Sequence, residues 1–239
     1  MLPAFDKFLS ASLLILAAAL LAACGGGASR ESSSKKETAA ATPAASTTPA
    51  ENVPKIVAFG DSLTAGYGLA PQESYPALLQ KMIDADGFKY EVVNAGVSGD
   101  TSAGGVRRID WSLDAGGVRF VILELGANDF LRGQPVAETR KNLSDIIKRA
   151  KSRGAQVLLA GMLTTTNTGR GYEVEISDAY KSLADEHDVP LIPFFLEGVA
   201  GIDRLNQEDR VHPNAEGTRL VAATVYRHLK PLLEKDSRK

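Results

Sequence analysis

Short apolar runs of strand length recur along the chain from about residue 54 onwards. They are IVAFG (56–60), YEVVNAG (90–96), FVILELG (120–126), QVLLAGM (156–162) and VPLIPFF (189–195). Several are rich in valine and isoleucine, and polar residues do not alternate within them. The pattern predicts strands that are buried on both faces, as in a parallel sheet.

The segments between these runs carry apolar residues at helical spacing. Four apolar faces are predicted: Tyr75, Leu78, Leu79, Met82 and Ile83; Val136, Leu143, Ile146, Ile147 and Ala150; Ile176, Tyr180, Leu183 and Ala184; and Val221, Val225, Leu229 and Leu232. Strands that alternate with helices imply right-handed crossovers around a parallel sheet. The sequence therefore predicts a three-layer α/β/α sandwich, in which ligands bind beyond the C-terminal ends of the strands.

The first 53 residues lack this alternation and predict export and anchoring. Residues 1–23 combine one lysine with an apolar stretch that ends in small residues, the layout of a signal peptide, and LLAAC (20–24) resembles a bacterial lipobox. We therefore expect Cys24 to become the lipidated N-terminus of the mature protein, held in a membrane of the bacterial cell envelope and facing the periplasm or the exterior. A transmembrane helix is the alternative, but the uncharged span 8–24 is shorter than the ~20 residues that a bilayer core requires.

Composition limits the partners of the rest of the chain. Residues 24–53 are rich in Gly, Ser, Thr, Ala and Pro and predict a flexible linker, whereas residues 54–239 have the length of one domain. The chain holds 27 basic and 29 acidic side chains, so its charge predicts no nucleic-acid partner. Cys24 is the only cysteine, which excludes a disulfide framework and a cluster of thiolate metal ligands.

Polar residues follow the apolar runs at the places where strands are predicted to end. They are GDSL (60–63), NAGVSGD (94–100) and GAND (126–129), and DRVHP (209–213) stands just before the last predicted helix. Because parallel strands end at one edge of a sheet, we expect these four turns to meet there. No G-x-G-x-x-G motif follows a strand and no G-x-x-x-x-G-K-[ST] loop is present, so a nucleotide-binding protein is set aside.

Ser62 is the candidate nucleophile and His212 the candidate base. Ser62 is predicted to begin a helix, where free N–H groups stabilise negative charge, although a serine there is equally well explained as an N-cap. His187 falls in the last turn of a predicted helix and His228 at a core-facing position, so we expect structural roles for both. His212 lies in a loop, three residues after Asp209, whose carboxylate is close enough to fix the imidazole tautomer.

These residues predict a Ser62–His212–Asp209 triad, and acyl transfer also requires donors for an oxyanion. The candidate donors are the N–H groups of Ser62 and Gly99 and the side-chain amide of Asn128. Ordinary turn chemistry explains Gly99 equally well, and a loop-stabilising Asx turn explains Asn128. The alternatives stay open at this point.

Two acidic residues and one loop complete the candidate site. We interpret Asp61 and Asp129 as structural carboxylates that bind nearby backbone N–H groups. Residues 164–175 (TTTNTGRGYEVE) are expected to form a loop that lines the pocket. Their sequence does not predict a preferred acyl-chain length.

The motifs GDSL (60–63), SGDT (98–101), GAND (126–129) and DRVHP (209–213) resemble, in order and context, the four sequence blocks of the SGNH (GDSL) hydrolase family. The resemblance extends from about residue 55 to residue 233. Longer segments such as GDSLTAGYGL and LELGANDFLRG are similar to the bacterial group of multifunctional thioesterase I, lysophospholipase and arylesterase.

The resemblance implies a flavodoxin-like sheet with strand order 2-1-3-4-5, no metal or cofactor, and hydrolysis of acyl esters and thioesters. It implies Ser62 as nucleophile, Gly99 and Asn128 as oxyanion donors, and His212 and Asp209 as the base and its orienting carboxylate. The expected substrate is a small acyl ester or thioester, lysophospholipids included, and the expected state is a monomer. An O-acetylesterase of cell-envelope polysaccharide and a non-catalytic ligand-binding lipoprotein are the alternatives.

Overall fold

The computed structural model describes residues 53–114, 116–163 and 170–238. The predicted signal peptide, the predicted lipidation site Cys24 and nearly all of the predicted linker lie outside the described residues. None of the described helices has the length and apolar character needed to cross a bilayer.

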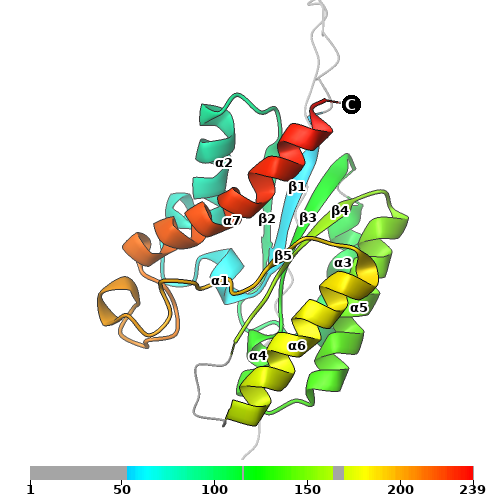
Figure 1. The fold of residues 1–239 in the computed structure, drawn as a ribbon. Helices are drawn as coiled ribbons and strands as arrows, with labels where there is room; N and C mark the ends of the chain where they lie inside the picture. The colour runs from blue at the N-terminus through cyan, green and yellow to red at the C-terminus, as the bar shows by residue number, and fades with distance from the viewer. Residues whose placement is uncertain (1–52, 115, 164–169, 239) are drawn as a thin grey trace, which may run out of the picture. The chain divides into compact units, whose positions relative to one another are not determined.

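Five parallel strands form one sheet in the order β2-β1-β3-β4-β5 (Figure 1). Their bounds are β1 Lys55–Gly60, β2 Glu91–Gly96, β3 Val118–Glu124, β4 Gln156–Ala160 and β5 Leu191–Ile192. Each predicted apolar run overlaps one strand, and the strand order is the one that the family resemblance implies. The predicted sheet is therefore confirmed.

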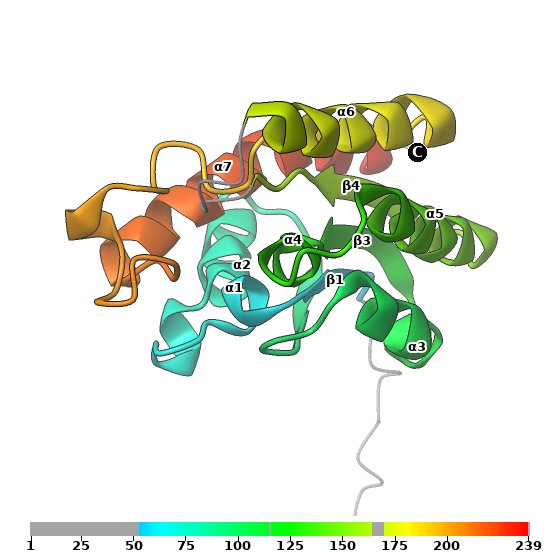
Figure 2. The same cartoon turned by 90° about the horizontal axis from the view of Figure 1, so that it is seen from below.

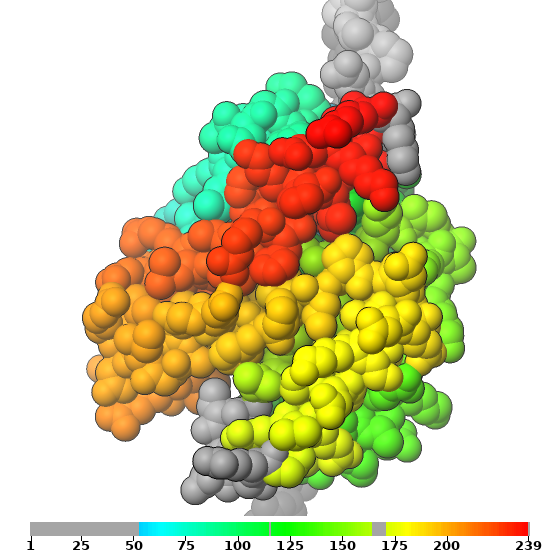
Figure 3. Space-filling model, in the orientation of Figure 1, coloured from blue at the N-terminus to red at the C-terminus, as the bar shows by residue number. Residues whose placement is uncertain are grey.

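The helices cover both faces of this sheet (Figure 2). Their bounds are α1 Ser62–Ala65, α2 Tyr75–Ala85, α3 Ser102–Leu113, α4 Ala127–Leu131, α5 Val136–Ser152, α6 Arg170–His187 and α7 Ala215–Asp236, with 3₁₀ turns η1 Pro71–Glu73 and η2 Asp203–Leu205. Helix α2 packs against α7, and α5 packs between α3 and α6. In the space-filling view, α6 and α7 flank the segment that joins them (Figure 3). This arrangement confirms the three-layer sandwich.

The predicted helical faces form much of the core. Most of their members are buried, and Leu78, Met82 and Leu232 are half-buried at the margin. Because each face repeats every three to four residues, it turns a continuous apolar stripe toward the sheet.

Three expectations about the elements are wrong. Strand β2 is only partly buried, because it forms the edge of the sheet and lacks a neighbour on one side. Strand β5 has two residues instead of a full run, since Pro190 and Pro193 bracket it and proline has no N–H to donate to a ladder. Residues 170–175, expected in the pocket loop, begin α6, and residues 164–169 lie outside the described part of the chain.

Glycines at the ends of β1 and β2 allow the strand-end turns to pack closely. A Cβ on Gly60 would lie 2.1 Å from Thr64 Oγ1 and 2.3 Å from Glu124 Oε2, and a Cβ on Gly96 would lie 2.2 Å from the backbone N of Ala65. These distances are too short for any side chain. Helix α1 packs directly against the ends of β1 and β2, and this close packing requires glycine at both positions.

Candidate active site

Helix α1 places Ser62 at the C-terminal edge of the sheet. Asp61 is the N-cap, and its Oδ1 accepts the N–H of Leu63 at 3.0 Å, so Ser62 is the first helical residue. The alternative of Ser62 as an N-cap is thus wrong. Gly66 ends the helix after one turn in the left-handed conformation, with φ of 82°. The hydroxyl of Ser62 is left free for another partner.

His212 lies in a tight turn that precedes α7. The N–H of Gln207 donates to the carbonyl of His212 at 2.8 Å and closes the turn. Asp209 Oδ1 accepts the N–H groups of Val211 and His212, both at 2.9 Å. One oxygen of the Asp209 carboxylate therefore holds the backbone of the turn, and the other is available to the imidazole.

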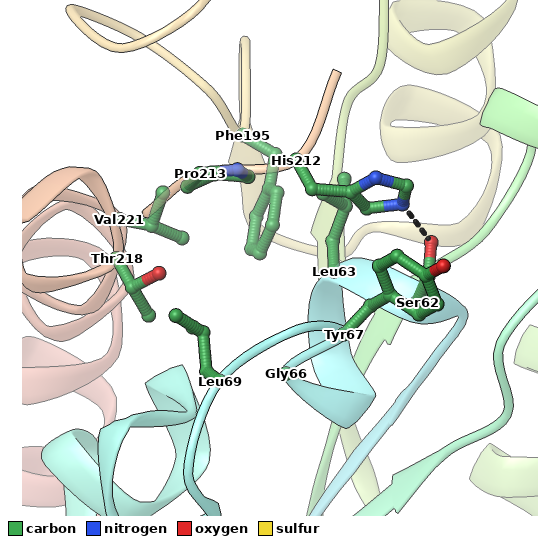
Figure 4. A pocket seen from close by; sticks show the side chains of 10 residues that line it. All are labelled: Ser62, Leu63, Gly66, Tyr67, Leu69, Phe195, His212, Pro213, Thr218 and Val221. Carbon is green, nitrogen blue, oxygen red and sulfur yellow. Dashed lines mark hydrogen bonds between the residues drawn. The ribbon is translucent and has the colours of Figure 1, made fainter. Parts of the chain in front are cut away.

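Ser62, His212 and Asp209 form one series of hydrogen bonds. Ser62 Oγ lies 2.9 Å from His212 Nε2, and His212 Nδ1 lies 2.7 Å from Asp209 Oδ2; Figure 4 shows the first of these bonds. Desolvation acts to raise the pKa of Asp209, but hydrogen bonds from the His212 N–H, the His212 ring and the Val211 N–H outweigh it and lower the pKa to about 2. Asp209 is therefore ionised at every pH well above 2, and any stabilisation it gives is lost as pH falls from about 4 toward 2.

The other two histidines lie away from this series, as predicted. His187 is buried and its Nε2 lies 2.8 Å from Ser144 Oγ, and desolvation lowers the pKa of its imidazole. His228 is half-buried on α7 and its Nδ1 lies 2.9 Å from the carbonyl of Thr224.

Two of the three predicted oxyanion donors are unengaged. Within the described residues, no hydrogen bond uses the peptide N–H of Ser62 or of Gly99, which has φ of 80°. The amide of Asn128 differs, since its Nδ2 donates to Asp61 Oδ2 and to the carbonyl of Asp100, both at 2.9 Å. These bonds account for both of its hydrogens.

Two hollows flank the bond between Ser62 and His212. The larger has about 560 Å³ of empty space, and its apolar lining consists of Leu63, Ala127, Leu131, Met162, Leu163, Leu196 and Val211. The smaller has about 260 Å³ and lies on the side of Tyr67 and Phe195 (Figure 4). A hydroxyl paired with an imidazole thus lies between a roomy apolar hollow and a narrow one.

The sequence model of the GDSL-like lipase/acylhydrolase family matches residues 58–220. The chain belongs to this family. The resemblance found in the sequence is therefore confirmed, and the protein is an ester hydrolase of the GDSL type.

Named relatives support this membership. The esterase TesA of Pseudomonas aeruginosa is 40% identical over 178 residues, which cover 74% of this chain and 89% of TesA. Thioesterase 1/protease 1/lysophospholipase L1 of Escherichia coli is 39% identical over 182 residues, covering 76% of this chain and 86% of the relative. The crystal structure of the esterase EstA from Pseudoalteromonas, inhibited by monoethylphosphonate, matches with a TM-score of 0.72 and 33% identity, covering 75% of this chain and 98% of EstA.

The two aspartates at this GDSL site that were predicted to be structural, Asp61 and Asp129, both bind nearby backbone N–H groups. Asp129 Oδ2 accepts the N–H of Ser102 at 2.8 Å, and Oδ1 accepts the Ser102 hydroxyl at 2.6 Å. Asp61 accepts the Leu63 N–H described above, so both predictions are confirmed. Among the described residues, no group of three or more histidine, aspartate or glutamate side chains is arranged to hold a metal ion.

The sequence analysis missed a buried carboxyl beneath Ser62. Glu124 is fully buried at the end of β3, and its Oε2 accepts the N–H of Asp61 at 3.2 Å and the Thr64 hydroxyl at 2.7 Å. Burial, together with the nearby Asp61 charge, raises the pKa of Glu124 well above its usual range. Burial also raises the pKa of Asp61 to about 6, although the Leu63 N–H, His212 and Asn128 act to lower it. Burial therefore favours the neutral form of the Glu124 carboxyl, and the only sequence signal of this group is a charged residue inside an apolar run.

The sequence analysis also missed Arg108. This residue lies on α3, and its side chain binds the C-terminal ends of β1 and β2. Its guanidinium donates to the carbonyls of Gly60 and Ala95 at 2.8 and 2.7 Å, and to Asp100 Oδ2 at 2.7 Å. Helix α3 carries Val106, Ile109 and Leu113 at helical spacing, but the two glycines in its first turn weaken the helical signal of the sequence. Gly105 packs closely against Leu125, since a Cβ on this glycine would lie 2.4 Å from Leu125 Cδ1.

The neutral state of Glu124 predicts the effect of Glu124→Gln. The folded protein retains a proton that the unfolded chain releases above about pH 4.5, so this group's contribution to stability is full below that pH and falls as pH rises. Glutamine does not titrate. We expect the free energy of unfolding of Glu124→Gln to rise relative to that of the parent between pH 5 and pH 8, by about 1.4 kcal/mol for each pH unit over which Glu124 stays protonated, as measured by urea unfolding. The exposed Glu91→Gln is the control, and an equal difference at both pH values would contradict a neutral Glu124.

Proposed function

We propose that the protein cleaves carboxylic esters and thioesters of acyl chains through a covalent acyl-enzyme. The observation that carries this proposal is the series Ser62 Oγ–His212 Nε2–Asp209, with distances of 2.9 and 2.7 Å. Relatives named esterase and thioesterase 1/lysophospholipase L1 support these substrate classes.

In the first half-reaction, His212 Nε2 takes the proton of Ser62 as Oγ attacks the acyl carbonyl carbon. The ionised Asp209 accepts a hydrogen bond from the Nδ1–H of His212, keeps Nε2 free to act as a base, and stabilises the imidazolium that forms. The tetrahedral intermediate collapses, and the imidazolium gives its proton to the leaving alcohol or thiol. The product of this half-reaction is an ester between the acyl group and Ser62.

The unengaged N–H groups of Ser62 and Gly99 donate to the oxyanion of the tetrahedral intermediate. The amide of Asn128 becomes the third donor when it exchanges one of its two protein acceptors, Asp61 or the Asp100 carbonyl, for that oxygen. Each such donor is worth about 3 kcal/mol of transition-state stabilisation.

Water completes the cycle in the second half-reaction. His212 removes a proton from water, which attacks the acyl carbon of the ester on Ser62, and the same proton then returns to Ser62 Oγ as the acid leaves. The apolar hollow beside Ser62 receives the acyl chain, since its lining offers Leu63, Met162 and Leu196 but few polar groups.

Hydrolysis of p-nitrophenyl acetate, octanoate and palmitate by the purified protein tests the substrate class. We expect kcat/KM for octanoate to exceed that for acetate by about tenfold or more, because each additional buried methylene contributes up to about 0.8 kcal/mol. Strict preference for acetate would instead support the O-acetylesterase. No hydrolysis of any ester, together with no labelling of Ser62 by a fluorophosphonate, would support a non-catalytic binding protein.

For the N-terminal residues, the proposal is an exported lipoprotein anchored through Cys24. Support comes from the sequence alone, in the apolar stretch and the LLAAC motif. Incorporation of labelled palmitate by the full chain in a bacterial host tests the anchor, and a soluble, unlabelled product would contradict it.

A further inference from the structure

The side-chain amide of Gln207 joins two segments that are far apart in the sequence. Its Nε2 donates to the carbonyl of Tyr67 at 2.7 Å and to the carbonyl of Pro213 at 3.0 Å. These bonds account for both hydrogens of the amide. Tyr67 lies five residues after Ser62, and Pro213 directly follows His212, so one amide links the serine segment to the histidine turn.

Backbone hydrogen bonds extend this link on both sides. The N–H of Tyr67 donates to the carbonyl of Ser62 at 3.0 Å, and the N–H of Gln207 donates to the carbonyl of His212 at 2.8 Å. A continuous path of hydrogen bonds therefore runs from the main chain of Ser62 through Tyr67 and Gln207 to the main chain of His212. It runs alongside the direct bond between Ser62 Oγ and His212 Nε2.

Two neighbours fit this link closely. The ring of Tyr67 lies beside the imidazole of His212, with ring centroids 4.7 Å apart (Figure 4). Gly68 has φ of 74°, and a Cβ there would lie 2.2 Å from Gln207 Oε1. The absence of a side chain at Gly68 therefore allows the amide of Gln207 to lie directly against the serine segment.

We propose that Gln207 is a positioning residue that sets the separation between Ser62 and His212. The inference rests on the proposed function, because it concerns the same serine and histidine. The two side chains come from positions 150 residues apart, and Asp209 organises only the turn on the histidine side. Gln207 fixes the backbone of the serine segment relative to the backbone of the histidine turn. A shift of about 1 Å between reacting groups costs on the order of 10²-fold in rate.

Two substitutions test this role. Gln207→Met keeps the length of the side chain and removes both donors, and Gln207→Glu places a carboxylate opposite two carbonyls. We expect either change to lower kcat for p-nitrophenyl octanoate by roughly 10- to 100-fold, with KM within about twofold, and to slow the labelling of Ser62 by a fluorophosphonate by a similar factor. Rates are expressed per active site, counted by complete labelling, so that misfolded protein does not enter the comparison.

Gln80→Met is the matched control. The amide of Gln80 also links two segments, donating to the carbonyl of Tyr90 at 2.9 Å and accepting the N–H of Val92 at 2.6 Å, but it does so between α2 and β2. We expect this variant to lose stability and to keep its kcat. A kcat within twofold of the parent in both Gln207 variants would overturn the positioning role. A parent protein that neither hydrolyses esters nor reacts with the fluorophosphonate would overturn the proposed function instead.

Discussion

Ser62→Ala is expected to lower kcat for p-nitrophenyl octanoate by on the order of 10⁴- to 10⁶-fold, because it removes the only atom that forms the covalent ester in the proposed mechanism. The oxyanion donors and the acyl hollow stay in place, so a small rate above that of water remains. The fold should persist, since Ser62 is half-buried and its side chain contributes one hydrogen bond, to His212. Steady-state kinetics and a thermal melt measure the two effects.

Ser144→Ala is the control, because it also removes a serine hydroxyl that is hydrogen-bonded to a histidine, but away from the proposed active site. Ser144 Oγ also lies 2.8 Å from an imidazole nitrogen, that of the buried His187. We expect this variant to lose about 1 kcal/mol of stability and to keep kcat within twofold. Activity of Ser62→Ala within tenfold of the parent would rule out the covalent step.

Asp209→Asn is expected to lower kcat by on the order of 10⁴-fold. The amide oxygen of asparagine can still accept the N–H groups of Val211 and His212, so the turn keeps its shape. Its amide nitrogen, however, faces His212 Nδ1 and donates a hydrogen there. The imidazole proton must then lie on Nε2, which points at Ser62, and this tautomer cannot accept the hydroxyl proton.

The tautomer explanation makes a second outcome measurable. The rate at which Asp209→Asn reacts with a fluorophosphonate should fall by about the same factor as its kcat for esters. Its melting temperature should stay within a few degrees of that of the parent. Asp114→Asn, which removes the exposed ion pair with Arg153, is the control and should keep full activity. A loss of only a few fold in Asp209→Asn would show that the carboxylate charge is dispensable, and that the triad needs another orienting group.

Ser62 and His212 were predictable because both follow local signals. Ser62 comes two residues after the end of a buried strand, and His212 stands in a polar turn before a helix, so the rule that parallel strands end at one edge brings them together. Asp209 was predictable from its spacing to His212 together with the serine at a strand end. The Asn128 amide was predictable as a candidate donor, but its two hydrogen bonds to Asp61 and the Asp100 carbonyl were not.

Glu124 and Gln207 had no such signal. Glu124 lies inside an apolar run and bonds to Asp61, 63 positions away, and Gln207 reaches Tyr67 across 140 positions. Helix α3 was missed because the two glycines of its first turn weaken its helical signal. The side chains of Glu124 and Gln207 act through contacts whose partners the local sequence does not specify.

The sequence by itself determined the sheet, the layers, the edge at which chemistry occurs and the residue types that gather there, since hydrophobic period and turn residues act over short distances along the chain. The tertiary structure decided the protonation of Glu124, the occupied amide of Asn128 and the link made by Gln207. These depend on burial and on hydrogen bonds between distant segments, which exist only once the strands have been brought side by side.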